Sequence, residues 1–290
     1  MAAEIKLTTT FAKPYNIDFV NQFGQGLNTL IDILNVQRRI PMPIGSTIKT
    51  YKSSVTLDGG KVAKGDIIPL SEVKQEPADT IELEWAKHRK AVAAEDIQKY
   101  GRDQAISRTD DLLVRELQKD LRKKLFDNLA KGTGKATGKG LQGALAQGWG
   151  SVQKVFEDDG ASTIAFVNPM DIADYLENAT VSIQNAFGLK YIEDFLGADV
   201  VVISSLVPAK TVYATAPDNL VLAYANMNNA ELSMFDFYVE ETGVIGVSHD
   251  IQMNRLTAET ITASAIALFA ERLDGVIVVT IKDEAVEAGK

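Results

Sequence analysis

The sequence predicts an α+β fold in which a long two-stranded excursion and one long helix accompany a separate α/β region. Three observations lead to this prediction. Residues 44–94 contain two segments of period-two alternation, residues 103–131 carry leucines at near four-residue spacing, and residues 141–224 alternate between helical and strand patterns. Strand patterns return after residue 234, so helices and strands are mixed without a single regular repeat.

The composition is that of a folded protein and excludes several functional classes. The 290 residues are 46% hydrophobic and 24% charged, and the formal net charge is -9. An acidic chain is poorly suited to gripping nucleic acid by its phosphates, which requires a positive surface. The chain has no cysteine, so disulfides and thiolate chemistry are excluded. No apolar run approaches the ~20 residues that span a bilayer, and we expect neither an export signal nor a membrane partner.

The N-terminal region is expected to combine an extended arm with a helix. Residues 1–15 are polar and rich in threonine, which favours an extended conformation. From Ile17 to Val36 the apolar residues follow helical spacing, and Asn16 is a plausible N-cap. Pro41 and Pro43 are expected to lie beyond the end of this helix.

Residues 44–94 are expected to form a long two-stranded excursion. Residues 47–51 alternate in polarity, and Ile81, Leu83 and Trp85 alternate with charged residues. Between these segments lie glycine and proline turn residues and two lysines, Lys61 and Lys64. A two-stranded ribbon is only marginally stable alone in water, so we expect it to lean on another copy of the protein.

The segment 103–131 predicts a long amphipathic helix. Leucines recur along one face, and the i,i+4 pairs Asp111 with Arg115 and Asp120 with Lys124 have the favourable order. Gly132 and Gly134 are expected to end the helix.

The remaining chain predicts an α/β region followed by strands. The α/β region contains helices over 141–156 and 169–178 and strands over 163–167, 200–203, 211–214 and 220–224, and Pro169 occupies the first helical turn. Candidate strands then cover 235–240, 243–250, 260–269 and 276–281. Leu273-Asp274-Gly275 is expected to join the last two strands as a hairpin turn.

No residue pattern points to catalysis, a cofactor or a metal. The glycine-lysine run at 132–140 lacks the spacing of a phosphate-binding loop and is interpreted as a flexible linker. His88 and His249 form no spaced ligand set and are interpreted as surface or strand histidines. The acidic clusters 157–159 and 240–241 are adjacent residues that point apart. We therefore predict that the protein is not an enzyme.

The order of these elements resembles the major capsid protein of tailed bacteriophages, which has the Hong Kong-type capsid fold. The local sequences that carry the resemblance are Phe23-Gly24 to Leu30-Ile31, Arg38 to Met42, Gly45 to Tyr51, Phe166-Val167-Asn168-Pro169, and the segment Phe269 to Ile281. The resemblance implies an N-terminal arm at 1–43, an extended loop at 44–94, the spine helix of a peripheral domain at 95–135, an axial domain at 136–228, and the rest of the peripheral domain at 229–290.

The resemblance also implies function, partners and location. It implies a structural protein that self-assembles as hexamers and pentamers into an icosahedral shell around the phage genome, double-stranded DNA held without sequence-specific binding. The expected location is the virion, assembled in the host bacterial cytoplasm. Expected partners are a portal and a possible decoration protein. A separate scaffolding protein is also expected, because no scaffolding segment precedes the arm. Candidate intersubunit contacts are Phe23, Leu27, Leu30, Lys61, Lys64 and Trp85.

Two alternatives stay open at this stage. The first is an encapsulin-like compartment, which would enclose a cargo enzyme in place of DNA. The second is an unrecognised α/β enzyme, which the absence of a familiar catalytic motif disfavours. Some capsid proteins join a loop lysine covalently to an asparagine of a neighbour. Lys61, Lys64 and Asn254 match no such motif, so we expect no cross-link.

Overall fold

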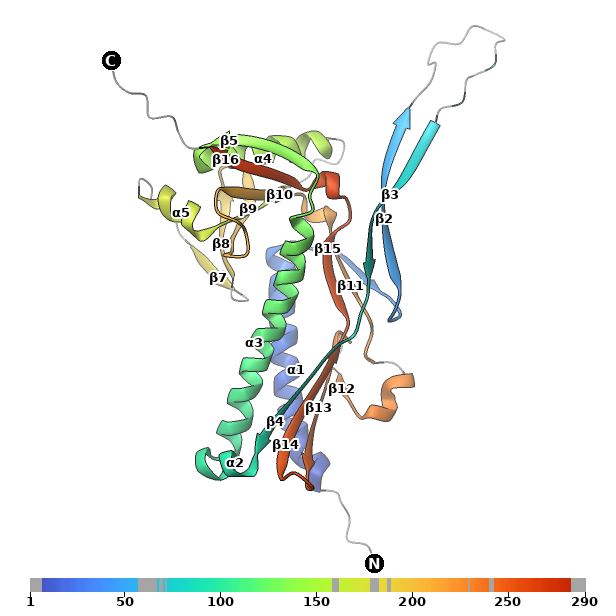
Figure 1. Cartoon of the computed structure of the whole chain (residues 1–290), viewed down its shortest axis with the longest axis vertical. Helices are drawn as coiled ribbons and strands as arrows, with labels where there is room; N and C mark the ends of the chain where they lie inside the picture. The colour runs from blue at the N-terminus through green and yellow to red at the C-terminus, as the bar shows by residue number, and fades with distance from the viewer. Residues whose placement is uncertain are drawn as a thin grey trace, which may run out of the picture.

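A computed structural model describes most of the chain, and Figure 1 shows an elongated molecule. Helices α1 and α3 lie side by side along the long axis, a mixed sheet occupies one end, and a two-stranded ribbon projects from one side. No helix in the described part of the chain is both long and apolar enough to cross a membrane. The described residues are 7–56, 67, 70, 72–157, 162–177, 183–186, 189–228, 230–239 and 243–282.

Helix α1 (Leu7–Ile33) is longer than the sequence predicts. The extended arm expected over residues 1–15 is wrong for residues 7–15, and Asn16 lies inside the helix and is not its N-cap. The helix passes through Pro14, which lacks the N–H that a helix interior uses. The helix continues through it because packing against the rest of the fold, more than local propensity, stabilises helices in proteins.

Helix α3 (Arg102–Leu129) confirms the predicted long amphipathic helix, and the short α2 (Ala94–Tyr100) precedes it. Its apolar face is buried against α1 and against strand β15 (Ile266–Ala270). Near its C-terminal end, the Asn128 side-chain oxygen accepts a hydrogen bond of 2.8 Å from the Ala270 backbone N–H. The buried residues of this face are Ile106, Asp110, Val114, Leu117, Leu121, Leu125, Phe126, Asn128 and Leu129.

The predicted α/β region is present and is built on a mixed sheet with the order β5-β16-β10-β6-β9-β8-β7. Helix α5 begins at Pro169 as predicted, and the Asn168 side chain caps it by accepting from the Met170 backbone N–H at 2.9 Å. The elements are β5 (Gly134–Lys139), α4 (Gly140–Val155), β6 (Ile164–Val167), α5 (Pro169–Leu176), β7 (Gln184–Ala186), β8 (Leu189–Phe195), β9 (Ala198–Ile203), β10 (Thr211–Thr215) and β16 (Ile277–Lys282).

Strand β5 corrects the prediction of a flexible linker at 132–140. It pairs in parallel with β16, and its glycines permit close approach between backbones. A Cβ added at Gly138 would lie 2.2 Å from the Ala144 backbone nitrogen, far inside van der Waals contact. The glycines of this run are therefore packing residues.

Two further sheets accompany α1 and α3. An antiparallel sheet has the order β12-β13-β14-β4, and a bridging sheet has the order β1-β11-β15. The antiparallel sheet consists of β4 (Ala86–Ala93), β12 (Tyr238–Val239), β13 (Ile245–Gln252) and β14 (Thr257–Ser264). The bridging sheet consists of β1 (Arg38–Pro41), β11 (Leu220–Tyr224) and β15. Short 3₁₀ turns are η1 (Pro217–Asn219), η2 (Ala230–Phe235) and η3 (Leu273–Gly275).

The C-terminal strands pair differently from the prediction. The expected strand at 260–269 divides at Ala265, because β14 pairs with β13 and β4 whereas β15 pairs with β11. The predicted hairpin at Leu273–Gly275 is wrong, since β15 and β16 belong to different sheets. The sheets also cross the expected domain boundaries: β16 joins the mixed sheet, β11 joins the bridging sheet, and β4 joins the antiparallel sheet.

The predicted two-stranded excursion is present as β2 (Thr47–Thr56) and β3 (Glu72–Glu82), which we call the ribbon. The two strands are antiparallel, with a register shift between Thr50 and Tyr51. At the base, Ile48 and Ile81 pack against the bridging sheet, and Figure 1 shows the outer part extending away from the other sheets. Lys61 and Lys64 lie outside the described residues.

Candidate functional site

Two features could carry function: a buried polar network and a wide groove. The network lies where α1 and α3 cover the antiparallel sheet, and the groove runs along the same sheet and shares Asn16 and His249 with the network. Among the described residues, no group of three or more His, Asp or Glu side chains is placed to hold a metal ion.

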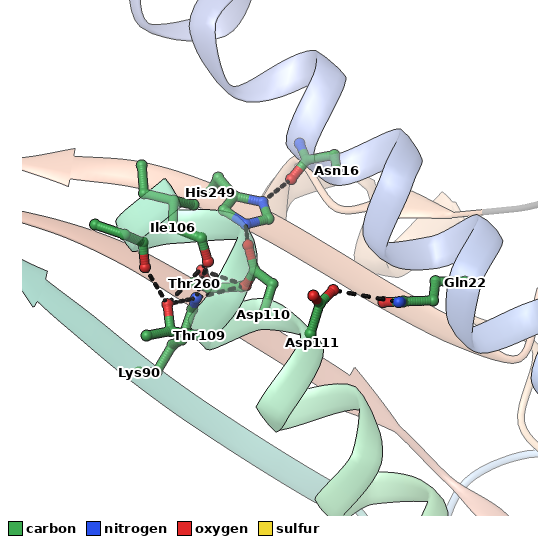
Figure 2. A network of polar contacts seen from close by, with 10 residues as sticks. Asn16, Gln22, Lys90, Ile106, Thr109, Asp110, Asp111, His249 and Thr260 are labelled. Atoms are coloured by element: carbon green, nitrogen blue, oxygen red, sulfur yellow. Dashed lines mark hydrogen bonds and ion pairs between the residues drawn. The ribbon is translucent and has the colours of Figure 1, made fainter. Parts of the chain in front are cut away.

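The polar network converges on the Asp110 carboxylate of α3 (Figure 2). One carboxylate oxygen lies 2.7 Å from the Lys90 Nζ and accepts from the Thr260 hydroxyl at 3.2 Å. The other oxygen lies 3.0 Å from His249 Nε2, and His249 Nδ1 lies 2.5 Å from the Asn16 side-chain oxygen. These residues come from β4, α3, β14, β13 and α1, so one cluster joins two helices to three strands of the sheet.

Burial removes water from the charged groups of this network, which carries a desolvation cost. The Lys90 side chain is 15% exposed and that of Asp110 is 8% exposed. Loss of solvation lowers the pKa of Lys90, and the hydrogen bond and charge of Asp110 oppose that shift. Lys90 Nζ also donates to the Ile106 carbonyl at 3.0 Å, so the ammonium has several acceptors.

The network shows what the sequence prediction for the histidines missed. His249 does lie on a strand, β13, but its side chain is buried and bonded at both ring nitrogens. His88, on β4, is exposed. The partners of His249 are far away in sequence, so spacing along the chain carries no signal of the cluster.

The groove has a volume of about 910 Å³ and is lined by residues of the antiparallel sheet, of η2 and of α1. Asn16 and His249 belong to both the groove lining and the network, whereas in β14 Ile261 lines the groove and Thr260 bonds to Asp110. Phe235 in the groove wall is 57% exposed. Its apolar lining includes Trp85, Leu232, Phe235, Phe237, Tyr238 and Ile261.

Charged residues lie within and beside this apolar lining. Lys87 lies over the Trp85 ring, with its Nζ 5.2 Å from the ring centroid, and Asp236 and Asp250 also line the groove. On the same face, Arg89 donates two hydrogen bonds to the Glu259 carboxylate, of 2.9 Å and 2.5 Å. Those hydrogen bonds lower the pKa of Glu259 and raise that of Arg89. The groove thus combines aromatic area with charges of both signs.

The predicted contact residues separate into three groups. Phe23, Leu27 and Leu30 are buried in the chain's own core, which corrects the expectation that they face a neighbouring copy. The helix bearing them is covered by α3 and β13 of the same chain. Lys61 and Lys64 lie outside the described residues, and Trp85 lines the groove.

Exposed apolar side chains occur at the start of β3 and between the two ribbon strands. Ile67 and Leu70, between β2 and β3, are each 94% exposed, and Val73 at the start of β3 is also exposed. The sequence prediction did not single these residues out. It also assigned 235–240 to a strand, whereas Phe235 ends η2, Phe237 contacts Gly246, and only Tyr238 and Val239 pair with β13.

The fold has relatives among solved shell proteins. The capsid of the cyanophage P-SCSP1u matches with a TM-score of 0.57 at 11% identity, over 86% of this chain and 87% of that chain. The holo-SrpI encapsulin complex from Synechococcus elongatus matches with a TM-score of 0.52 at 12% identity, over 88% and 90%. The virus-like particle from Pyrococcus furiosus matches with a TM-score of 0.51 at 12% identity, over 91% and 99%.

The architecture is therefore that of a viral-type shell subunit. The chain has the Hong Kong-type capsid fold, as the resemblance to tailed-phage major capsid proteins implies. No protein-family model and no curated protein matches the sequence.

Proposed function

We propose that the protein is a structural subunit that self-assembles as hexamers and pentamers into an icosahedral phage capsid around double-stranded DNA. The observation that carries this proposal is a capsid fold with a projecting ribbon, at and beside which large apolar side chains are exposed. Closed shells need self-complementary surfaces repeated around symmetry axes. In this proposal, the mixed sheet with α4 and α5 is the axial region, and α3 with the antiparallel sheet is the peripheral region.

The groove and the ribbon are the surfaces that we assign to contacts between copies. Val73 presents apolar area on the ribbon, and Ile67 and Leu70 present apolar area between its two strands. The groove along the antiparallel sheet has an aromatic lining. Contiguous apolar surface of this kind marks interaction sites in soluble proteins. We propose that the groove receives a second copy, with Trp85 among the contact residues.

The finer assignments follow from this role. They comprise location in the virion, assembly in the host cytoplasm, and partnership with a scaffolding protein, a portal and a possible decoration protein. No catalytic activity is proposed. The formal net charge of -9 supports a lining that repels DNA on average, which lets the genome enter and leave.

A second candidate is an encapsulin-like compartment. The encapsulin match has nearly the same coverage and score as the cyanophage capsid, which favours keeping this candidate. The two functions differ in what the assembled particle encloses. Particles purified from cells in which the protein occurs naturally would contain DNA if it is a capsid and a cargo protein if it is a compartment.

The test of the groove uses one substitution and one matched control. Phe235→Asp introduces a charge into the groove lining, and Met253→Asp introduces the same charge at a 73% exposed position between β13 and β14. We expect Phe235→Asp to shift sedimentation from large assemblies to free subunits, because a desolvated aspartate opposes contact. Met253→Asp should assemble like the unmodified chain. Equal assembly of both variants would contradict the groove assignment.

A further inference from the structure

The two ring nitrogens of His249 have unequal partners. Nε2 faces the Asp110 carboxylate, which also accepts from Lys90 and Thr260, so Nε2 carries a proton and donates it. Nδ1 faces the side-chain oxygen of Asn16 at 2.5 Å. A neutral imidazole with its proton on Nε2 has only a lone pair at Nδ1, which would oppose the lone pairs of that oxygen.

The Asn16 amide can satisfy two protonation states of His249. With its oxygen towards Nδ1, as in Figure 2, it accepts from a ring that carries protons on both nitrogens. Turned by half a revolution, its NH₂ group would donate to Nδ1 of the neutral ring. Oxygen and NH₂ have nearly the same size, so both orientations fit the same space. The orientation of Asn16 is therefore coupled to the charge on His249.

The charged groups around the ring can be named element by element. Asp110 of α3 is in direct contact, and Lys90 of β4 pairs with the far oxygen of the same carboxylate. From α1, the Tyr15 ring lies 5.8 Å from the His249 ring, and its hydroxyl donates to Asp103. The other neighbouring charges are Asp111, which is bonded to Gln22, the groove residues Lys87, Asp236 and Asp250, and Glu259, which is paired with Arg89.

We propose that His249 is a proton-operated clamp on helix α1. Uptake of a proton from solvent at Nδ1 converts the ring to an imidazolium that donates to Asp110 on one side and to Asn16 on the other. Histidine changes charge between about pH 5 and 8, and a charge-assisted hydrogen bond is roughly twice as strong as a neutral one. Helix α1 is thus held more firmly against α3 and β13 at pH 5.5 than at pH 7.5. This inference does not depend on the proposed shell function.

The chain offers a matched control, because its two histidines are His249 and the exposed His88. Hydrogen–deuterium exchange of the full chain, corrected for intrinsic exchange rates, is measured over residues 15–33 at pH 5.5 and 7.5. We expect about fivefold greater protection at pH 5.5, the size of the difference between a charge-assisted and a neutral hydrogen bond. His88→Gln should keep this difference, and His249→Gln should abolish it. Equal protection at both pH values would overturn the proposal.

Variants of Asn16 and direct observation of the ring keep the test decisive if His249→Gln does not fold. Asn16→Asp offers only acceptors to Nδ1 and should extend strong protection to pH 7.5. Asn16→Leu should remove the pH dependence. In ¹⁵N-histidine-labelled His88→Gln protein, the His249 Nδ1 resonance should move to the protonated range between pH 7.5 and 5.5, while Nε2 stays protonated. An Nδ1 that stays unprotonated at pH 5.5, or a pH effect that persists in Asn16→Leu, would overturn the clamp.

Discussion

At the scale of single residues, Asp110 organises the structure more than any site that the sequence singles out. Its carboxylate is bonded to Lys90, Thr260 and His249, which come from different strands. A buried charge is tolerated only when partners replace its hydration. The sequence predicts α3 and its apolar face, but nothing in a helical pattern shows that Asp110 faces inwards, because aspartate is usually solvated.

Removing Asp110 should therefore be far more damaging than removing an exposed aspartate of the same helix. In Asp110→Ala, Lys90 loses its counter-charge while remaining buried, and we expect the free energy of unfolding to fall by about 3 kcal/mol or more. Asp120→Ala, which removes a surface pair with Lys124, should change it by less than about 1 kcal/mol. Urea denaturation of unassembled subunits measures both. Similar losses in the two variants would show that the network contributes little.

The Arg89–Glu259 pair predicts a pH-dependent contribution to stability. Hydrogen bonds from Arg89 hold the pKa of Glu259 below its ordinary value of 4.5 in the folded chain. A carboxylate with a lowered folded pKa stabilises the fold above its unfolded pKa, and this contribution is lost as pH falls through the folded pKa. Arg89→Met should thus lower the urea midpoint of unfolding at pH 7. The difference in urea midpoint between this variant and the unmodified chain should shrink as pH falls below 4.5. Arg115→Met on α3 serves as control. An undiminished difference at low pH would contradict this assignment.

At the scale of elements, periodic patterns predict the long helix, the ribbon and most strands, whereas pairing depends on packing that the sequence does not display. The run 132–140 shows the difference. Its glycines and lysines are typical of a linker, yet they form β5 because β16 and α4 approach the backbone closely. Likewise, the continuous strand pattern at 260–269 contains no signal that Ala265 separates two sheets. Strands β1, β7 and β8 were not predicted at all.

Two glycines, Gly138 in β5 and Gly150 in α4, give opposite predictions. In Gly138→Ala, the new methyl group would overlap the Ala144 backbone, and we expect a loss of several kcal/mol, more than ordinary overpacking causes, because backbone cannot move aside cheaply. In Gly150→Ala, within α4, no atom lies within 4 Å of the new methyl group, and the gain should be about 0.5–1 kcal/mol. Thermal unfolding measures both changes. A tolerated Gly138→Ala would mean that β5 can separate from α4.

At the scale of the whole molecule, the order of elements resembles the capsid fold, and the structure confirms that resemblance. The contact surfaces were predicted less well. Helix α1 buries Phe23, Leu27 and Leu30 in the core that it shares with α3 and β13 of the same chain. A helical pattern in the sequence shows only that an apolar face must be covered, not which chain covers it. The groove is formed by α1, β4, β12–β14 and η2, which are distant in sequence. Of the four predicted contacts that the structure describes, only Trp85 lines it.

The central claim, that this chain builds a closed shell, is tested most directly by electron microscopy of the purified protein, expressed alone or with the scaffolding protein that we propose as its partner. If the ribbon and the groove both contact neighbouring copies, as proposed, copies should associate around symmetry axes. The account predicts rings of five or six subunits and closed icosahedral particles. A monodisperse monomer that persists at high concentration under both conditions would contradict it.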